Sequence, residues 1–127
     1  MIHEEICTYE VAKLAKEKGF NEKCNFYYQK GVINTDGCFN RYNKGVEYIC
    51  SAPTQSLLQR WLREEKGVAI EIVALPATYI SGLFEYKHSV FWNSNGHYME
   101  AEYDDRIFGT YELALEDAEL YVLKNLL

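Results

Sequence analysis

Seven cysteine and histidine side chains, the residues most able to bind a metal or act in covalent chemistry, are scattered along this sequence of 127 residues. Zinc needs three or four such ligands, usually supplied as closely spaced pairs. Because no CxxC, HxxxH or HExxH spacing occurs, the sequence predicts no metal site and no cofactor. The pool of possible ligands is Cys7, Cys24, Cys38, Cys50, His3, His88 and His97.

A nucleophilic site would pair one of these cysteines with a base and an acid that orients the base. Cys50, His88 and Glu100 could form such a group, which makes a small hydrolase-like enzyme one alternative function. No nucleophile elbow, phosphate-binding glycine loop or dinucleotide fingerprint accompanies them. For His88 and His97 the simpler prediction is a polar pair facing across a hairpin.

Aromatic residues are frequent, with 11 Tyr and 6 Phe, and rings on a sheet face can stack single-stranded bases. A single-stranded nucleic-acid binder is therefore another alternative. The net charge of −6 disfavours it because it repels a phosphate backbone. The candidate rings are Phe26, Tyr27, Tyr28, Tyr48, Phe91, Trp92 and Tyr98, with Arg41, Lys44, Arg60 and Arg63 as possible backbone contacts.

The stretch from Ser51 to Ala74 is the strongest structural signal, and it predicts a helix followed by a strand. Pro53 suits the start of a helix, and Ser51 or Thr54 can cap it. An apolar stripe centred on Trp61 runs along the helix. Gly67 ends the helix, and the spacing of apolar residues then changes from the helical period to the period of two that is typical of strands.

Similar patterns predict two more helices, one over 9–18 after a Thr8 cap and one after Thr110. Strand-like runs occur within 25–30, 46–50, 83–92 and 97–103, and Asn95-Gly96 predicts a tight hairpin. Pro76 predicts a turn or strand exit within 75–78. The fold class is therefore α+β, with a mostly antiparallel sheet of about four to five strands and three helices packed on it.

Length and composition favour one domain over 1–127. The N-terminal sequence has neither the basic nor the apolar region of a secretion signal, and no stretch is apolar enough to span a membrane. We therefore expect a cytoplasmic protein with no membrane contact and with reduced cysteines.

Three segments resemble a family of small uncharacterised proteins of phages and mobile elements of Bacteroides-type bacteria. They are TYEVAKLAKEKGF at 8–20, SAPTQSLLQRWLREEKG at 51–67 and TYELALEDAELYVLKNLL at 110–127. The resemblance implies a phage or prophage origin. It supplies no catalytic residue and no established activity.

With no catalytic signature, the leading hypothesis is a non-enzymatic protein-interaction module. Its partner would be another protein or a second copy of this chain. Exposed aromatic residues are frequent anchors of protein interfaces. The predicted anchors here are Trp92 and Tyr98.

Overall fold

The computed structural model describes residues 2–35, 49–77, 83–101 and 106–127. Within these ranges the chain is α+β, with three helices and two three-stranded antiparallel sheets. The fold class is confirmed, but the strand number and the single sheet are wrong. The elements are α1 (Tyr9–Glu17), β1 (Phe26–Gln29), β2 (Val32–Asn34), β3 (Ile49–Ala52), α2 (Gln55–Glu65), β4 (Val68–Pro76), β5 (Phe84–Ser94), β6 (His97–Ala101) and α3 (Tyr111–Asn125).

All three helices begin at a threonine cap. The side-chain oxygens of Thr8, Thr54 and Thr110 accept hydrogen bonds from backbone N–H groups three residues later, at 3.5, 3.2 and 3.1 Å respectively. Each bond satisfies one of the N–H groups that a helix start leaves unpaired. The predicted helix starts are therefore confirmed, and Thr54 rather than Ser51 is the cap of α2.

The end of α1 shows how a glycine closes a helix against the core. Gly19 has a φ of 96°, and the Phe20 N–H turns back to the carbonyl of Ala15 at 2.9 Å. The Phe20 ring is buried and meets the Trp61 ring edge-on, with centroids 5.2 Å apart. The closing turn of α1 thus connects the first helix to α2.

The larger sheet has the order β4-β5-β6. Asn95 and Gly96 form the predicted two-residue turn between β5 and β6, and their φ values of 52° and 82° fit a type I′ turn. This turn places Ser94 opposite His97. Further along β5, Val90 lies opposite Ala101 in β6 and opposite Ile70 in β4. The register therefore assigns every side chain of the sheet to one of two faces.

Strand β4 ends at Pro76, so the predicted strand exit within 75–78 is confirmed. The Ala77 N–H donates to the Leu83 carbonyl at 3.0 Å. In an antiparallel pair the backbone groups of alternate residues point toward the partner strand, so the odd-numbered residues of β4 form the hydrogen bonds to β5. Pro76 has even number, so the N–H that proline lacks would point away from β5. No ladder bond is lost, because β4 is an edge strand.

The smaller sheet has the order β2-β1-β3. Lys30 and Gly31 form the turn between β1 and β2, and β3 pairs antiparallel with the other edge of β1. All four residues of β3 are buried. The predicted strand 46–50 is shown only from Ile49 onward, because its first residues lie outside the described ranges.

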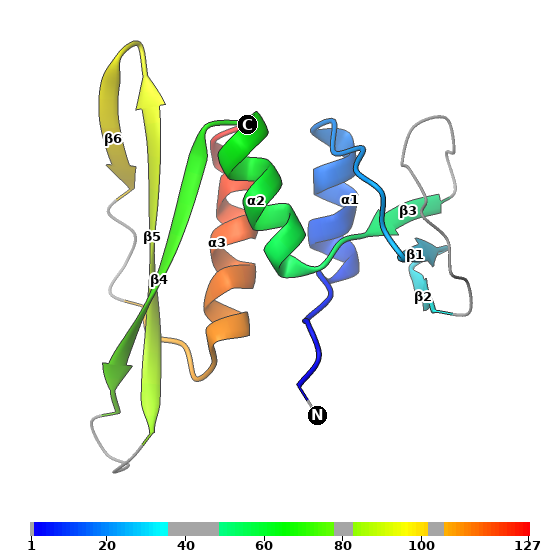
Figure 1. Cartoon of the computed structure of the whole chain (residues 1–127), viewed down its shortest axis with the longest axis horizontal. Helices are drawn as coiled ribbons and strands as arrows, with labels where there is room; N and C mark the ends of the chain where they lie inside the picture. Colours follow the sequence, from blue (N-terminus) through cyan, green and yellow to red (C-terminus); the bar gives the residue numbers. More distant parts are fainter. Residues whose placement is uncertain (1, 36–48, 78–82, 102–105) are drawn as a thin grey trace.

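The three helices lie between the two sheets (Figure 1). Helices α2 and α3 pack on the larger sheet, and α1 packs on β3 and on α3. One cluster of buried apolar side chains joins these elements, with Leu58, Leu62, Val90 and Leu123 at 0% exposure. The core therefore covers only one face of the larger sheet.

Candidate functional site

The face of the larger sheet that points away from the helices is a candidate interaction surface, which we call the outer face. Val90 is fully buried beneath the helices, so the alternation of side chains places Phe91 on the opposite side. No helix of the described chain covers that side (Figure 1). The outer face comprises Ala69, Glu71, Val73, Leu75, Glu85, Lys87, Ser89, Phe91, Asn93, Tyr98 and Glu100.

Two stacked rings form the most prominent apolar feature of the outer face. Phe91 in β5 and Tyr98 in β6 lie nearly parallel, with centroids 5.6 Å apart and an angle of 25° between the rings. Tyr98 is 70% exposed. The apolar setting raises the pKa of its phenol, and the carboxylates of Glu100 and Glu71 raise it further. Tyr98 presents its ring and hydroxyl to solvent.

Trp92, the other predicted anchor, lies on the opposite side of the sheet. It pairs with Val68 and Met99 and packs against the core cluster while remaining partly exposed. Neighbouring residues of a strand point to opposite faces, so Trp92 points away from the face that Phe91 shares with Tyr98. Trp92 and Tyr98 therefore do not form one surface. Tyr98 and Phe91 form the exposed pair instead.

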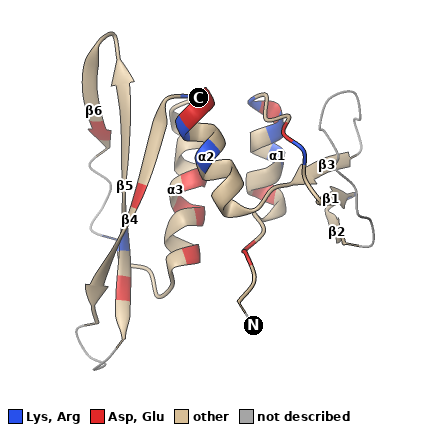
Figure 2. Ribbon diagram, viewed as in Figure 1, with Lys and Arg blue, Asp and Glu red and all other residues tan. Residues whose placement is uncertain are grey.

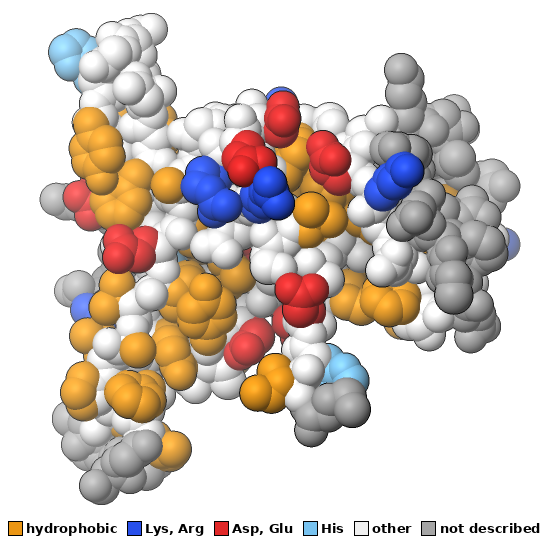
Figure 3. Space-filling view, viewed as in Figure 1, with side chains coloured by type: hydrophobic (Ala, Val, Ile, Leu, Met, Phe, Trp, Pro, Cys, Tyr) orange, Lys and Arg blue, Asp and Glu red, His pale blue; other side chains and the backbone are white. Residues whose placement is uncertain are grey.

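Charged residues alternate with apolar residues on the outer face: Glu71 lies between Ala69 and Val73 along β4, and Glu100 pairs with Phe91. The three carboxylates of this face, Glu71, Glu85 and Glu100, outnumber its one ammonium group, Lys87. Figure 2 shows acidic and basic positions along the strands of this sheet, and Figure 3 shows apolar side chains gathered over the same sheet. Val73 is 39% exposed, and Ala69 and Leu75 are partly exposed. The outer face thus presents apolar and acidic side chains side by side.

The residues considered for nucleophilic chemistry are not brought together. Cys50 lies in β3 of the smaller sheet, whereas His88 lies in β5 of the larger sheet, with the helices between them (Figure 1). His88 faces the helices, while Glu100 is on the outer face. His97 is opposite Ser94 at the turn, so the predicted His88–His97 pair is wrong.

His88 instead joins the larger sheet to α3. Its Nε2 atom donates to Asp117 Oδ2 at 2.9 Å, and Arg106 donates to the other carboxylate oxygen at 3.4 Å. Phe108 stacks on the imidazole ring, with centroids 5.7 Å apart. Because the His88 side chain is 1% exposed, this group fixes α3 on β5 rather than facing a ligand.

The three described cysteines, Cys7, Cys24 and Cys50, are buried and free. Burial raises the pKa of all three thiols, to about 12 for Cys24. A thiol with a raised pKa is a weak nucleophile, because the thiolate is the reactive form. Their environment is that of small core residues, and Cys38 lies outside the described ranges.

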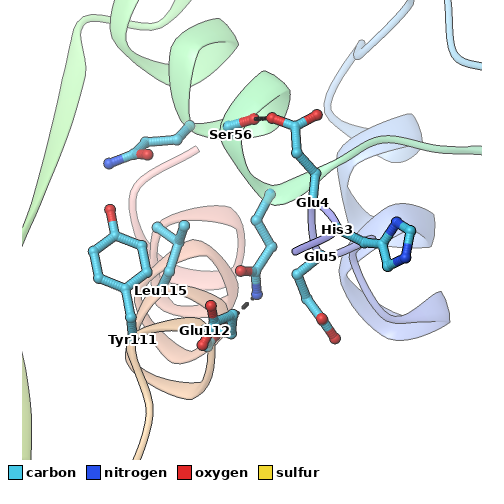
Figure 4. Close-up of a pocket in the computed structure, with 9 residues that line it drawn as sticks. His3, Glu4, Glu5, Ser56, Tyr111, Glu112 and Leu115 are labelled. Carbon is cyan, nitrogen blue, oxygen red and sulfur yellow. Dashed lines mark hydrogen bonds between the residues drawn. The ribbon is translucent and has the colours of Figure 1, made fainter. Parts of the chain in front are cut away.

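No group of three or more potential metal ligands occurs among the described residues. A hollow of about 140 Å³ lies between the N-terminal segment and the starts of α2 and α3 (Figure 4). Two hydrogen bonds connect segments that line this hollow: Ser56 donates to Glu4 at 2.8 Å, and the Gln55 amide donates to the Glu112 carbonyl at 2.9 Å. These hydrogen bonds connect the N-terminal segment, α2 and α3.

The aromatic residues considered for base stacking do not share one sheet face. Phe26, Tyr27 and Tyr28 are in β1, whereas Phe91 and Trp92 are in β5 of the other sheet. Arg60 and Arg63 are exposed on α2, and Arg60 pairs with Glu64 at 3.1 Å. Tyr48, Arg41 and Lys44 lie outside the described ranges.

A second hollow, which sequence reasoning missed, lies between α1 and the smaller sheet. Tyr9, Lys13 and Lys16 follow each other at helical spacing along α1 and meet Tyr28 and Lys30 from β1 and its turn. The spacing of the two lysines on α1 was visible in the sequence. Their approach to Lys30 was not, because it depends on how α1 packs on a distant hairpin.

Comparison of the chain with protein-family models, with curated proteins and with solved structures found no match. Among the described residues, no helix combines the length and the apolar character needed to cross a membrane.

Proposed function

We propose that this chain is a non-enzymatic protein-interaction module whose contact surface is the outer face. The observation that carries the proposal is the stacked pair Phe91 and Tyr98 on a sheet face that no described helix covers. Tyrosine and phenylalanine bury a large area at small entropic cost and are enriched at the centres of interfaces. Flanking apolar residues extend this centre along β4.

The acidic residues of the outer face favour one kind of partner, a protein surface that presents both apolar side chains and lysine or arginine. Two copies meeting through the outer face would bring Glu71, Glu85 and Glu100 of both chains together, which opposes self-association. A nucleic-acid backbone would meet the same repulsion. Charge complementarity therefore supports a basic protein partner.

The resemblance of the segments at 8–20, 51–67 and 110–127 to small phage and mobile-element proteins supports a place for this module in phage or prophage physiology. We propose that it acts in the cytoplasm of a Bacteroides-type host as an accessory protein. The partner would then be a host or phage protein in the same compartment.

The experiment is a tagged pull-down from such a host lysate, with and without nuclease, with the wild type and two variants. Phe91→Ala combined with Tyr98→Ala removes the ring pair, and Arg63→Ala is a control on exposed α2. We expect a stoichiometric protein that survives nuclease, is retained by the control and is lost from the double variant. Circular dichroism checks that the double variant is folded.

Salt provides an independent readout of the acidic residues of the outer face. A basic partner should dissociate as salt rises, because screening weakens attraction between exposed charges. If the double variant captures the same protein as well as the wild type does, the outer face is not the interface. If the captured material disappears on nuclease treatment, the protein-partner proposal fails.

A further inference from the structure

The hollow between α1 and the smaller sheet, which we call the lysine pocket, has features of a small-molecule site. Its volume is about 490 Å³, within the range of roughly 300–1,000 Å³ that is usual for small-molecule pockets. It lies on the opposite side of the helices from the outer face (Figure 1). Its lining residues are Tyr9, Lys13, Lys16, Glu17, Tyr28, Lys30, Ile49 and Cys50.

The lysine pocket has an excess of positive charge, whereas the protein as a whole is negatively charged. Three lysines and one glutamate line it, although the whole chain has a net charge of −6. Lys16 Nζ donates to the Ile49 carbonyl at 2.6 Å, which holds its ammonium group against β3. Within the described part of the chain, Lys13 and Lys30 form no ion pair. The pocket therefore concentrates positive charge that an anion could neutralise.

Beside the lysines, the pocket offers flat aromatic surface. The rings of Tyr9 and Tyr28 lie 5.4 Å apart, tilted by 53°. Tyr28 is anchored, because its hydroxyl donates to the Cys7 carbonyl at 2.7 Å. Ile49 and Cys50 add apolar surface from β3. A ligand with a planar ring next to an anionic group would match both parts of this lining.

The backbone at Lys30 provides a second, independent observation. Lys30 has a φ of 52°, in the left-handed region that is unfavourable for residues other than glycine, asparagine and aspartate. Residues kept in such conformations cluster at ligand sites. Asparagine would suit this turn better than lysine. The chain nevertheless has a lysine here, and its side chain is among those that line the pocket.

We propose that the lysine pocket binds a nucleoside monophosphate, with the phosphate contacted by Lys13 and Lys30 and the base lying against Tyr9. A phosphate suits ammonium groups, which act as point charges with several N–H donors. The volume suits one nucleotide rather than a strand, and the acidic surface elsewhere would repel further phosphates. The site is separate from the proposed protein interface.

The test is a calorimetric titration of the full chain with AMP, GMP, CMP and UMP. We expect at least one to bind with a stoichiometry of one and to bind more weakly as salt rises. Adenosine lacks the phosphate and ribose 5-phosphate lacks the base, so their affinities report the contribution of each part. If AMP is the preferred ligand, each should bind at least roughly tenfold more weakly than AMP. For another preferred nucleotide, its own nucleoside replaces adenosine.

Variants locate the site. Lys13→Ala and Lys30→Asn should each weaken binding by roughly tenfold, as expected for loss of a charge-assisted contact. Tyr9→Leu should weaken binding of the nucleotide but not of ribose 5-phosphate. Arg63→Ala removes one positive charge outside the pocket and should leave binding unchanged.

Several outcomes would overturn the proposal. It fails if none of the four nucleotides binds, or if ribose 5-phosphate binds as tightly as the best nucleotide. It also fails if amide chemical-shift changes in NMR spectra avoid the residues that line the pocket, or if a 5′-phosphorylated oligonucleotide binds more tightly than the mononucleotide. The melting temperature of Lys30→Asn is measured alongside, and we expect it to rise, so that loss of binding in a folded variant is assigned to the lost ammonium group.

Discussion

Lys30 and Asn95 occupy the same position in two similar turns, and each has a φ of 52°. Each is followed by a glycine, Gly31 with a φ of 78° and Gly96 with a φ of 82°. Both turns connect two antiparallel strands through two residues. Asparagine tolerates this left-handed conformation well and lysine does not, so only the first hairpin carries strain.

We expect Lys30→Asn to raise the free energy of unfolding by about 0.5–1 kcal/mol, because asparagine relieves part of the left-handed strain. The matched change Asn95→Lys introduces that strain into the second hairpin and should lower stability by a similar amount. Urea unfolding followed by circular dichroism measures both. A Lys30→Asn protein less stable than the wild type would show that lysine makes a contact outweighing the strain.

Trp61→Ala should lower the free energy of unfolding by about 3–5 kcal/mol, the usual range for removing a buried large aromatic ring. The ring is 6% exposed, packs edge-on against Phe20 and lies beneath the ammonium group of Lys66. The matched control Trp92→Ala should cost less, because Trp92 is only partly buried. Equal losses in the two variants would contradict the central place given to α2 in the core.

Helix positions could be predicted because their signals are local. Thr8, Thr54 and Thr110 are caps in the structure, and each identity can be seen beside its own apolar stripe. The Asn95-Gly96 turn is also local, since two adjacent residues fix its type. For these elements, the residues that set the structure lie within a few positions of each other.

The number of sheets could not be predicted, because strand pairing depends on distant segments. Alternation shows that β1 and β3 are strands, but it does not show that they pair with each other and not with β4. The strand exit within 75–78 was predicted correctly, because β4 ends at Pro76, but the sequence alone did not show that β4 is an edge strand.

The candidate site was only partly within reach of the sequence. Tyr98 was identified as an exposed ring, but its partner Phe91 follows from register, and the neighbouring Trp92 faces the core. The turn at Asn95-Gly96 was sufficient to separate His88 from His97, because it places His97 opposite Ser94. The lysine pocket depends on packing of α1 against a hairpin and has no local signal.

Gln59→Ala should destabilise the fold by about 0.5–1.5 kcal/mol and expose the free edge of β4. The Gln59 side-chain amide donates to the Ile70 carbonyl at 3.0 Å, on the edge that points away from β5. Unpaired edge groups invite pairing with another strand, and this bond together with Pro76 limits such pairing. Sedimentation velocity should detect more self-association in the variant.

Arg63→Ala, on the exposed part of the same helix, is the control for Gln59→Ala and should change neither stability nor self-association. A Gln59→Ala protein that remains monomeric at every concentration tested would show that Gln59 does not protect the edge. The stability measurement would still report on the hydrogen bond alone.

Glu119 makes stability depend on pH in the direction opposite to that of most carboxylates. It is 0% exposed, and neither carboxyl oxygen has a hydrogen-bond partner among the described residues. Burial raises the pKa of this carboxyl well above its ordinary value of 4.5, and the charge of Glu116 raises it further. The folded state therefore holds a proton that the unfolded state releases.

The sign of the pH dependence follows from this proton. Below the unfolded pKa both states are protonated, and Glu119 causes no dependence. As pH rises from the unfolded pKa of about 4.5 to the raised folded pKa, the folded state binds more protons, so stability falls. Glu119→Gln should remove this decline, and Glu119→Met should raise stability at neutral pH by about 1–3 kcal/mol by removing two unpaired oxygens. Urea unfolding across this pH range measures both variants against the wild type, and a wild-type decline that persists unchanged in Glu119→Gln would assign it to another group.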